Sequence, residues 1–228
     1  MDQLRVHDPL SADWVVALLL IAVGVLAYIN LAAPKKWRLL TTSVFSLRLT
    51  KGSLRDELDL RDRTLVALLA MAALLIALFA YQLVVVRGLV PPGFGRFLRI
   101  LVVLVVLVLA QLLVLRSVGV LSGSERGLEE YLYTSLLFYI VLGLVLIPVT
   151  ALTAFPYDTA LRRGALIVGA IAVVGSFLLR WSRAVLIGLG EGVPVRFIFL
   201  YLCTAEILPV ALLCEQARRS IPAPSNPF

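Results

Sequence analysis

The sequence predicts an all-α, polytopic integral membrane protein with six transmembrane helices. Of its 228 residues, 61% are hydrophobic, and the mean hydropathy is +1.00, whereas apolar residues make up only about half of a soluble globular chain. Several uncharged runs reach the roughly 20 residues that a helix needs to cross a bilayer. Short segments rich in charge, proline or glycine separate these runs and mark the turns between spans.

The first span covers residues 14–33 and the second covers 64–86, with a basic loop, 34–63, between them. The N-terminal tail, residues 1–13, lacks the basic region and cleavage site of a signal peptide, so the first span is expected to stay in the protein. Apolar residues alternate with basic ones in the loop, which predicts one or two short interfacial helices at the lipid headgroups. A docking platform for a partner protein is the alternative interpretation. The basic positions concerned are Lys35, Lys36, Arg38, Arg48 and Arg55.

Four further spans follow in the rest of the chain. They cover residues 97–121, 131–155, 164–189 and 195–214. With the first two they form a single transmembrane domain, 14–217. The C-terminal tail, 218–228, is rich in proline and is expected to be extended or disordered.

The distribution of Lys and Arg predicts the orientation of the chain. These residues are more frequent in the first, third and fifth loops than in the termini and the other two loops. By the positive-inside rule, the large first loop is therefore cytoplasmic and both termini are periplasmic. The net charge of +7 reflects this clustering beside spans, so nucleic-acid binding is not expected.

Most catalytic machinery is missing from the predicted spans. His7 is the single histidine and lies in the tail, which excludes haem ligation by two histidines and the zinc site of HExxH proteases. The spans contain no aspartate, and the chain has neither a P-loop nor a GxSxG motif. Ser135 and Ser176 have no histidine base and are expected to pack or to bond to their own helix backbone. We expect no catalysis, no metal and no cofactor.

The sixth span carries one carboxylate, Glu206, near its middle. Ten residues separate it from Arg196, so it lies about 15 Å inside the span. Cys203 and Pro209 share its face, and Pro209 leaves the carbonyl of Ala205 without a helical donor. An acid beside a free acceptor can coordinate a cation or hold water, and ionisable groups at this depth usually face protein or a hydrated cavity.

The predicted intramembrane polar site has six residues, and two prolines mark helix kinks. The polar residues are Glu206, Cys203, Tyr201, Arg180, Arg183 and Gln111, and the kinks are at Pro209 and Pro148. Three roles stay open for Glu206: a structural pair with Arg180 or Gln111, a proton or ion site, or substrate or lipid binding. In a hairpin that turns near Gly190, residue 206 lies opposite about residue 174, roughly 9 Å deeper than Arg180, and Arg183 is farther still.

The end of the sixth span resembles a known family. The run Tyr201-Leu202-Cys203, continued by Glu206-Ile207-Leu208-Pro209, is similar to the C-terminal pattern of an uncharacterised family of small multi-span membrane proteins from Bacteroidota. Looser similarities are found in the first loop and in the fourth span, where Tyr139 stands in place of a polar amide. These positions are Phe45, Arg48, Arg55, Glu57, Gly143 and Pro148. The resemblance implies a bacterial inner-membrane location and an envelope-related role, without an established activity.

These observations together predict a non-catalytic subunit or assembly factor of a cell-envelope complex. Its expected partners are the lipid bilayer and either another membrane protein or a second copy of the chain. The alternative is a small proton- or ion-coupled transporter or lipid translocator that uses Glu206. An enzyme acting on lipid has the least support, because nucleophile–base pairs are missing from the spans.

Overall fold

A computed structural model describes residues 9–122, apart from 33–62, and residues 125–190, apart from 157. Throughout this part of the chain the regular structure is helical. A short 3₁₀ helix, η1 (Pro9–Ser11), precedes five long helices, which are α1 (Asp13–Ala32), α4 (Arg63–Val86), α5 (Phe94–Ser122), α6 (Glu125–Ala154) and α7 (Thr159–Gly190). The predicted sixth span, the interfacial helices of the basic loop and the C-terminal tail lie outside the described residues.

All five long helices are long and apolar enough to cross a membrane. They correspond to five of the six predicted spans and suggest a multi-pass membrane protein. The helices α6 and α7 begin six and five residues before the spans predicted there. The prediction began these two spans directly after the charged residues Glu130 and Arg163, but a helix keeps its backbone hydrogen bonds through such residues once they leave the hydrocarbon.

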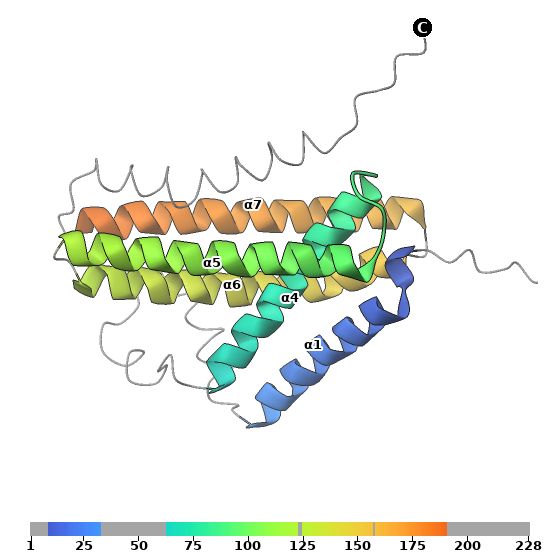
Figure 1. Ribbon diagram of the computed structural model, residues 1–228, viewed down its shortest axis with the longest axis horizontal. Helices are drawn as coiled ribbons and strands as arrows, with labels where there is room; N and C mark the ends of the chain where they lie inside the picture. Colours follow the sequence, from blue (N-terminus) through green and yellow to red (C-terminus); the bar gives the residue numbers. More distant parts are fainter. Residues whose placement is uncertain (1–8, 33–62, 123–124, 157, 191–228) are drawn as a thin grey trace, which may run out of the picture.

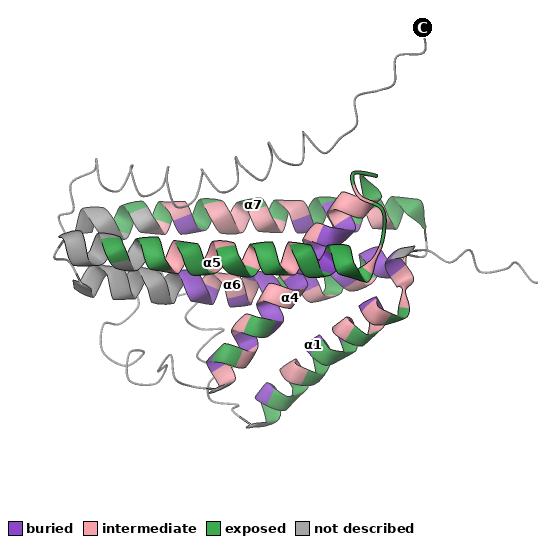
Figure 2. Cartoon of the chain, viewed as in Figure 1, coloured by how far each residue is buried: buried purple, intermediate pink, exposed green. Residues whose placement is uncertain are grey.

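The helices α4 and α6 form the centre of the bundle. The two pack against each other, α7 packs on α6, and α5 and α1 pack on α4. Figure 1 shows α5, α6 and α7 lying side by side along the long axis, with α4 and α1 inclined to them. Figure 2 shows buried residues on α4 and α6, and exposed ones along α5 and α7.

Two glycines of the bundle allow close approaches between helices. A Cβ atom at Gly143 of α6 would lie 2.6 Å from the Cα atom of Ala72 in α4. A Cβ atom at Gly169 of α7 would overlap the ring of Phe79 and the side chain of Val149. Small residues of this kind let membrane helices meet with their backbones nearly in contact, where van der Waals packing is strongest.

An aromatic cluster closes one end of the bundle and joins three helices. Trp14 of α1 lies with its ring centroid 5.3 Å from that of Tyr81 in α4 and 5.3 Å from that of Phe97 in α5. The ring of Phe94 completes the cluster. The backbone N–H of Gly93 donates to the Tyr81 hydroxyl oxygen at 3.0 Å, so the same tyrosine also holds the turn that leads into α5.

That turn begins with a Schellman cap at the end of α4. Gly88 has a φ of 69°, and its N–H donates to the carbonyl of Val85, while the N–H of Leu89 donates to the carbonyl of Val84. Glycine suits the left-handed conformation that this cap requires. Pro91 and Pro92 follow and prevent the helix from continuing.

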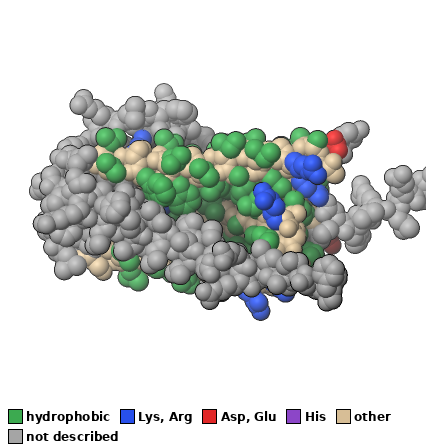
Figure 3. Space-filling model, turned by 90° about the horizontal axis from the view of Figure 1, so that it is seen from above, with side chains coloured by type: hydrophobic (Ala, Val, Ile, Leu, Met, Phe, Trp, Pro, Cys, Tyr) green, Lys and Arg blue, Asp and Glu red, His purple; other side chains and the backbone are tan. Residues whose placement is uncertain are grey.

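The outer surface is apolar along the length of the bundle. Figure 3 shows hydrophobic side chains over the middle of one long face, with most of the visible charged side chains toward one end. On α5 the exposed residues are largely valines and leucines, which include Val102, Val103, Val106, Leu109 and Leu113. In water such a surface would be costly, whereas in a bilayer it contacts lipid chains.

Candidate functional site

Arg180 is a buried cation in the wall between α6 and α7. Its side chain is 5% exposed, and ten residues, or about 15 Å of helix, separate it from the end of α7 at Gly190. A guanidinium at such a depth is costly unless protein groups replace its hydration, which makes it the first candidate for a functional or organising residue.

Tyr139 of α6 supplies one of these groups. The guanidinium carbon of Arg180 lies 5.1 Å from the centroid of the Tyr139 ring, a cation–π contact worth about 2 kcal/mol when it is shielded from water. The hydroxyl of Tyr139 donates to Oε1 of Gln111 in α5 at 3.2 Å. One tyrosine therefore connects polar side chains of α5 and α7.

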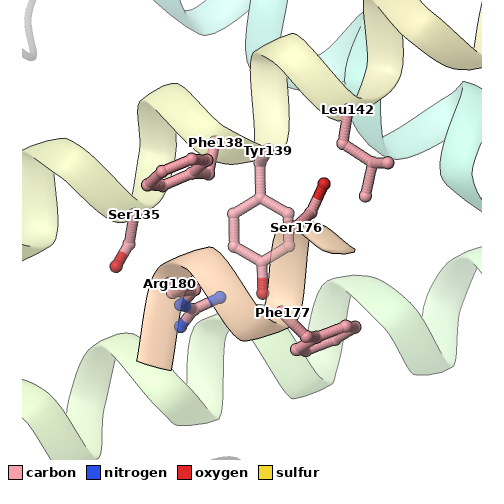
Figure 4. Close-up of a pocket in the computed structure, with 7 residues that line it drawn as sticks. All are labelled: Ser135, Phe138, Tyr139, Leu142, Ser176, Phe177 and Arg180. Carbon is pink, nitrogen blue, oxygen red and sulfur yellow. The ribbon is translucent and has the colours of Figure 1, made fainter. Parts of the chain in front are cut away.

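A small cavity adjoins Arg180 between the two helices. Its volume is about 20 Å³, which is room for one water molecule or the tip of one side chain. In Figure 4 the Tyr139 ring reaches from α6 toward α7, with Arg180 on one side of it and Ser176 on the other. The lining residues are Ser135, Phe138, Tyr139 and Leu142 of α6, and Ser176, Phe177 and Arg180 of α7.

The two serines of this cavity differ in their hydrogen bonds. Ser176 donates to the carbonyl of Ala172 at 2.8 Å, one turn earlier in α7, so the prediction that it bonds to its own helix is confirmed. Ser135 is buried as predicted for a packing residue, but within the described part of the chain its hydroxyl has no hydrogen-bond partner. A buried hydroxyl of this kind can donate a hydrogen bond to an acceptor that enters the cavity.

Arg183 lies one turn farther along α7 in a similar setting. Its guanidinium carbon is 5.1 Å from the centroid of the Phe138 ring, and its side chain is only partly buried. Both arginines thus stack on consecutive aromatic residues of α6. Only Arg180 belongs to the cavity.

A second polar contact joins α4 and α6 at the centre of the bundle. Gln82 is fully buried and donates through Nε2 to the carbonyl of Thr150 at 3.0 Å. The hydroxyl groups of Thr150 and Thr153 donate to carbonyls one turn earlier in α6. Pro148 lies in this segment, and α6 continues through it as one helix.

The structure brings together three of the residues predicted for the polar site. Gln111 and Arg180 meet through Tyr139, and Arg183 lies beside them. The other predicted positions fall outside the described residues: Glu206, Cys203, Tyr201 and Pro209, and in the basic loop Lys35, Lys36, Arg38, Arg48 and Arg55. Over the residues that are described, no cluster of three His, Cys, Asp or Glu side chains could hold a metal ion.

The sequence analysis did not predict that Ser135 and Tyr139 of α6 line the same cavity as Arg180 of α7. Ser135 and Tyr139 follow an i, i+4 spacing on α6, and Ser176 and Arg180 follow the same spacing on α7. Such a spacing places each pair on one helix face. Two polar pairs on consecutive spans joined by a short loop are the signal that could have identified these two helices.

Comparison with known proteins gives one family and no characterised relative. A family model described as a domain of unknown function, DUF4271, matches residues 15–216. Neither the comparison with curated proteins nor that with solved structures gives a match. The matched region runs from α1 through α7 and includes the predicted sixth span, so the chain belongs to the DUF4271 family of domains of unknown function.

Proposed function

We propose that this chain is a non-catalytic subunit or assembly factor of a cell-envelope complex in the bacterial inner membrane. The close packing at the centre of the bundle is the observation that carries this proposal. Such a domain would present a constant shape to a partner protein. The lipid bilayer surrounds the chain, and the partner is a second membrane protein or another copy of the chain.

The contacts between α4, α6 and α7 support a rigid core. Gly143 lies against Ala72, and Gly169 against Phe79 and Val149, so neighbouring helices are too close to slide past these points. The buried polar side chains bridge helices: Gln82 joins α4 to α6, and Tyr139 joins α6 to α5. Both features favour a scaffold over a protein whose helices move during a transport cycle.

The basic first loop is the proposed contact region outside the membrane. It joins α1 to α4 and carries Lys35, Lys36, Arg38, Arg48 and Arg55. A cytoplasmic position for this loop follows from the positive-inside rule, and both termini are then periplasmic. From there the loop could bind anionic lipid headgroups or an acidic surface of the partner.

The test is a purification from native membranes with a mild detergent. A subunit is expected to elute at a native mass above that of the single chain in its detergent micelle, with one companion at a fixed ratio. Replacement of the five basic loop residues by glutamine should release the companion and leave the thermal unfolding midpoint of the chain unchanged. A chain that elutes alone, at monomer mass, in several mild detergents would contradict the proposal.

The alternative is a proton- or ion-coupled transporter, or a lipid translocator, that depends on Glu206. A buried Arg180 beside a water-sized cavity favours this alternative, because charged residues next to internal water occur along ion pathways. Purified protein in liposomes should then support proton or ion flux, or lipid scrambling. That flux should be lost in Glu206→Gln while the variant stays folded.

A further inference from the structure

We propose that the end of the bundle where α5 and α7 begin binds anionic phospholipid. The phosphate of the lipid contacts arginines near the start of these helices, and an acyl chain lies along the apolar surface that follows on the same helix. This site is separate from the basic first loop, and it is independent of the proposed role as a subunit.

Positive charge is concentrated at this end of the bundle. The helices α1, α5 and α7 begin there, and α4 and α6 end there. Figure 3 shows Lys or Arg side chains at the end of the apolar face where α7 begins. Among the described residues of this end, two are aspartates, Asp13 and Asp158, and five are arginines, which are Arg87, Arg96, Arg99, Arg162 and Arg163. This excess of guanidinium groups attracts anions.

Two of the arginines form an exposed pair on α5. Arg96 and Arg99 are three residues apart, so their side chains are neighbours on one helix face, and both are exposed. Like charges at this spacing repel each other. A phosphate group removes this repulsion, because its oxygens accept N–H bonds from both guanidinium groups. The pair is therefore suited to a single phosphate.

The arginines lie at the height of lipid headgroups. The candidate membrane spans of α5 and α7 begin at Phe94 and Thr159. Arg99 and Arg163 lie five and four residues farther on, which is within about 8 Å of these ends. Trp14 packs against the start of α5, and tryptophan is typical of the membrane interface. At this height an arginine can extend its stem and reach the phosphate layer.

An exposed apolar track follows the arginines along each helix. On α5, Val103, Val106 and Leu113 share the face of Arg99 and are 42%, 56% and 67% exposed. On α7, Arg163 is followed on its own face by Ile167, Ile171, Val174 and Leu178, which are 57–66% exposed. A cation above an apolar track matches the phosphate and the acyl chain of one phospholipid molecule. Inorganic phosphate would leave the track uncovered, so we assign the anion to lipid.

The helices α1 and α4 at the same end lack this combination. The exposed face of α1, which includes Leu20, Ile21 and Leu31, begins at Asp13, whose charge repels a phosphate. Arg87 follows α4, where the residues on its face one and two turns earlier are only half-buried or less exposed; these are Leu83, Val84 and Ala80. Asp13 and Arg87 therefore provide internal controls.

Photo-crosslinking with the purified full-length chain in a neutral detergent tests the proposal. The probe is phosphatidylglycerol with a diazirine on its acyl chain, and mass spectrometry of the peptides measures labelling of each helix separately. We expect labelling of α5 and α7 at lower probe concentrations than labelling of α1. A phosphatidylcholine probe with the same diazirine should show no such preference.

Arginine variants relate the labelling to charge. One arginine beside an anionic lipid strengthens binding about fivefold, so the half-saturating concentration for labelling of α5 should rise about fivefold in Arg99→Gln and about 25-fold in Arg96→Gln/Arg99→Gln. Labelling of α7 in the same samples should stay unchanged. Arg99→Lys should retain most of the labelling because it keeps the charge. The thermal unfolding midpoint without lipid should not change, because both side chains are exposed.

Arg87→Gln is the matched control, since it removes the same charge at the same end without an exposed track. An equal loss of α5 labelling in Arg87→Gln would indicate a general surface potential and overturn the site. Equal labelling of α5 by the two probes, or of α1 and α5 by phosphatidylglycerol, would also overturn it. Displacement of the probe by an equal concentration of inorganic phosphate would identify free phosphate as the ligand and overturn the assignment to lipid. A failure here leaves the proposed partner protein untouched, because that proposal is tested by co-purification.

Discussion

At the scale of single residues, the smallest side chains have the largest structural effect. Gly143 and Ala72 set the distance between α4 and α6, and Gly169 does the same between α7 and the side chains of Phe79 and Val149. A buried Leu can repack when a neighbour grows, but a backbone cannot move without moving its helix. The contact at Gly143 is therefore the least tolerant of added atoms.

Gly143→Ala should lower the free energy of unfolding by about 1–3 kcal/mol, because the new methyl group would overlap the backbone of Ala72. The better helix propensity of alanine, about 1 kcal/mol, offsets only part of this loss. Gly24→Ala in α1 is the control, since nothing lies within 4 Å of a Cβ atom there. The thermal midpoint in detergent measures both variants, and equal midpoints would contradict the close contact.

Tyr81→Phe should cost about 1 kcal/mol, because the N–H of Gly93 loses its acceptor while the aromatic packing is kept. Tyr28→Phe is the matched control: Tyr28 is 69% exposed on α1, and its replacement should leave the midpoint unchanged. The same unfolding measurement applies. A larger loss in Tyr28→Phe than in Tyr81→Phe would show that the turn before α5 is held in another way.

At the scale of whole elements, α5 and α6 have opposite roles. The helix α6 contacts α4, α5 and α7, and it supplies Ser135, Phe138 and Tyr139 to the site. The helix α5 presents most of its valines and leucines outward. An apolar helix with so little burial is stable at the edge of the bundle only if lipid or a partner protein covers it.

A lysine on α5 should be tolerated near its end and not at its middle. Val106, which is 56% exposed, lies twelve residues from the start of α5, and Leu98 lies four residues from it. Val106→Lys is expected to cost about 2.5–3.5 kcal/mol of insertion energy at the bilayer centre. In Leu98→Lys the ammonium can reach the headgroups along its stem. The amount of folded protein in the membrane fraction measures the difference, and equal amounts would argue that α5 does not face lipid.

At the scale of the whole molecule, consecutive helices alternate in direction. Trp14 at the start of α1, the turn before α5 and the end of α6 therefore lie at one end of the bundle. The end of α1, the start of α4 and the end of α7 lie at the opposite end. If the helices cross the membrane in the proposed orientation, the first end faces the periplasm and the second faces the cytoplasm.

Cysteine labelling checks this arrangement. In a Cys203→Ser, Cys214→Ser background, Leu89→Cys in the turn after α4 should react with an impermeant maleimide applied to spheroplasts. Ser53→Cys in the basic loop should react only after the membrane is opened. The reverse pattern would invert the orientation, and labelling of both from one side would mean that α4 does not cross the membrane.

The helical class and five spans could be predicted from the sequence, because each depends only on residues close together in the chain. The length of an uncharged run determines whether a helix can span the membrane, and Gly88, Pro91 and Pro92 determine a turn, whatever the other helices do. The predicted span 64–86 differs from α4 by a single residue for this reason. The predicted first residues of α6 and α7 were less accurate, because each helix begins among charged residues before its apolar run.

The sequence was insufficient for the lateral arrangement of the helices. Gln111 was predicted for the intramembrane polar site, but its contact with Tyr139, like the contact of Gln82 with Thr150, depends on which helix faces lie together. The role of Gly143 depends in the same way on the backbone of Ala72. Apart from the few polar residues of α6 and α7, apolar side chains lie on all sides of these helices, so hydrophobicity carries little information about which face is buried.

The aromatic cluster has a consequence for the order in which the protein assembles. Trp14 is made first, yet its partners Tyr81, Phe94 and Phe97 belong to the second and third long helices. Eighty-three residues separate Trp14 from Phe97, and at about 5–20 residues per second the ribosome needs roughly 4–17 s to make them. Until α4 and α5 have been made, Trp14 lacks every ring partner of this cluster. We therefore expect the first helix to leave the ribosome to reach its final place only after the hairpin of α4 and α5 has formed.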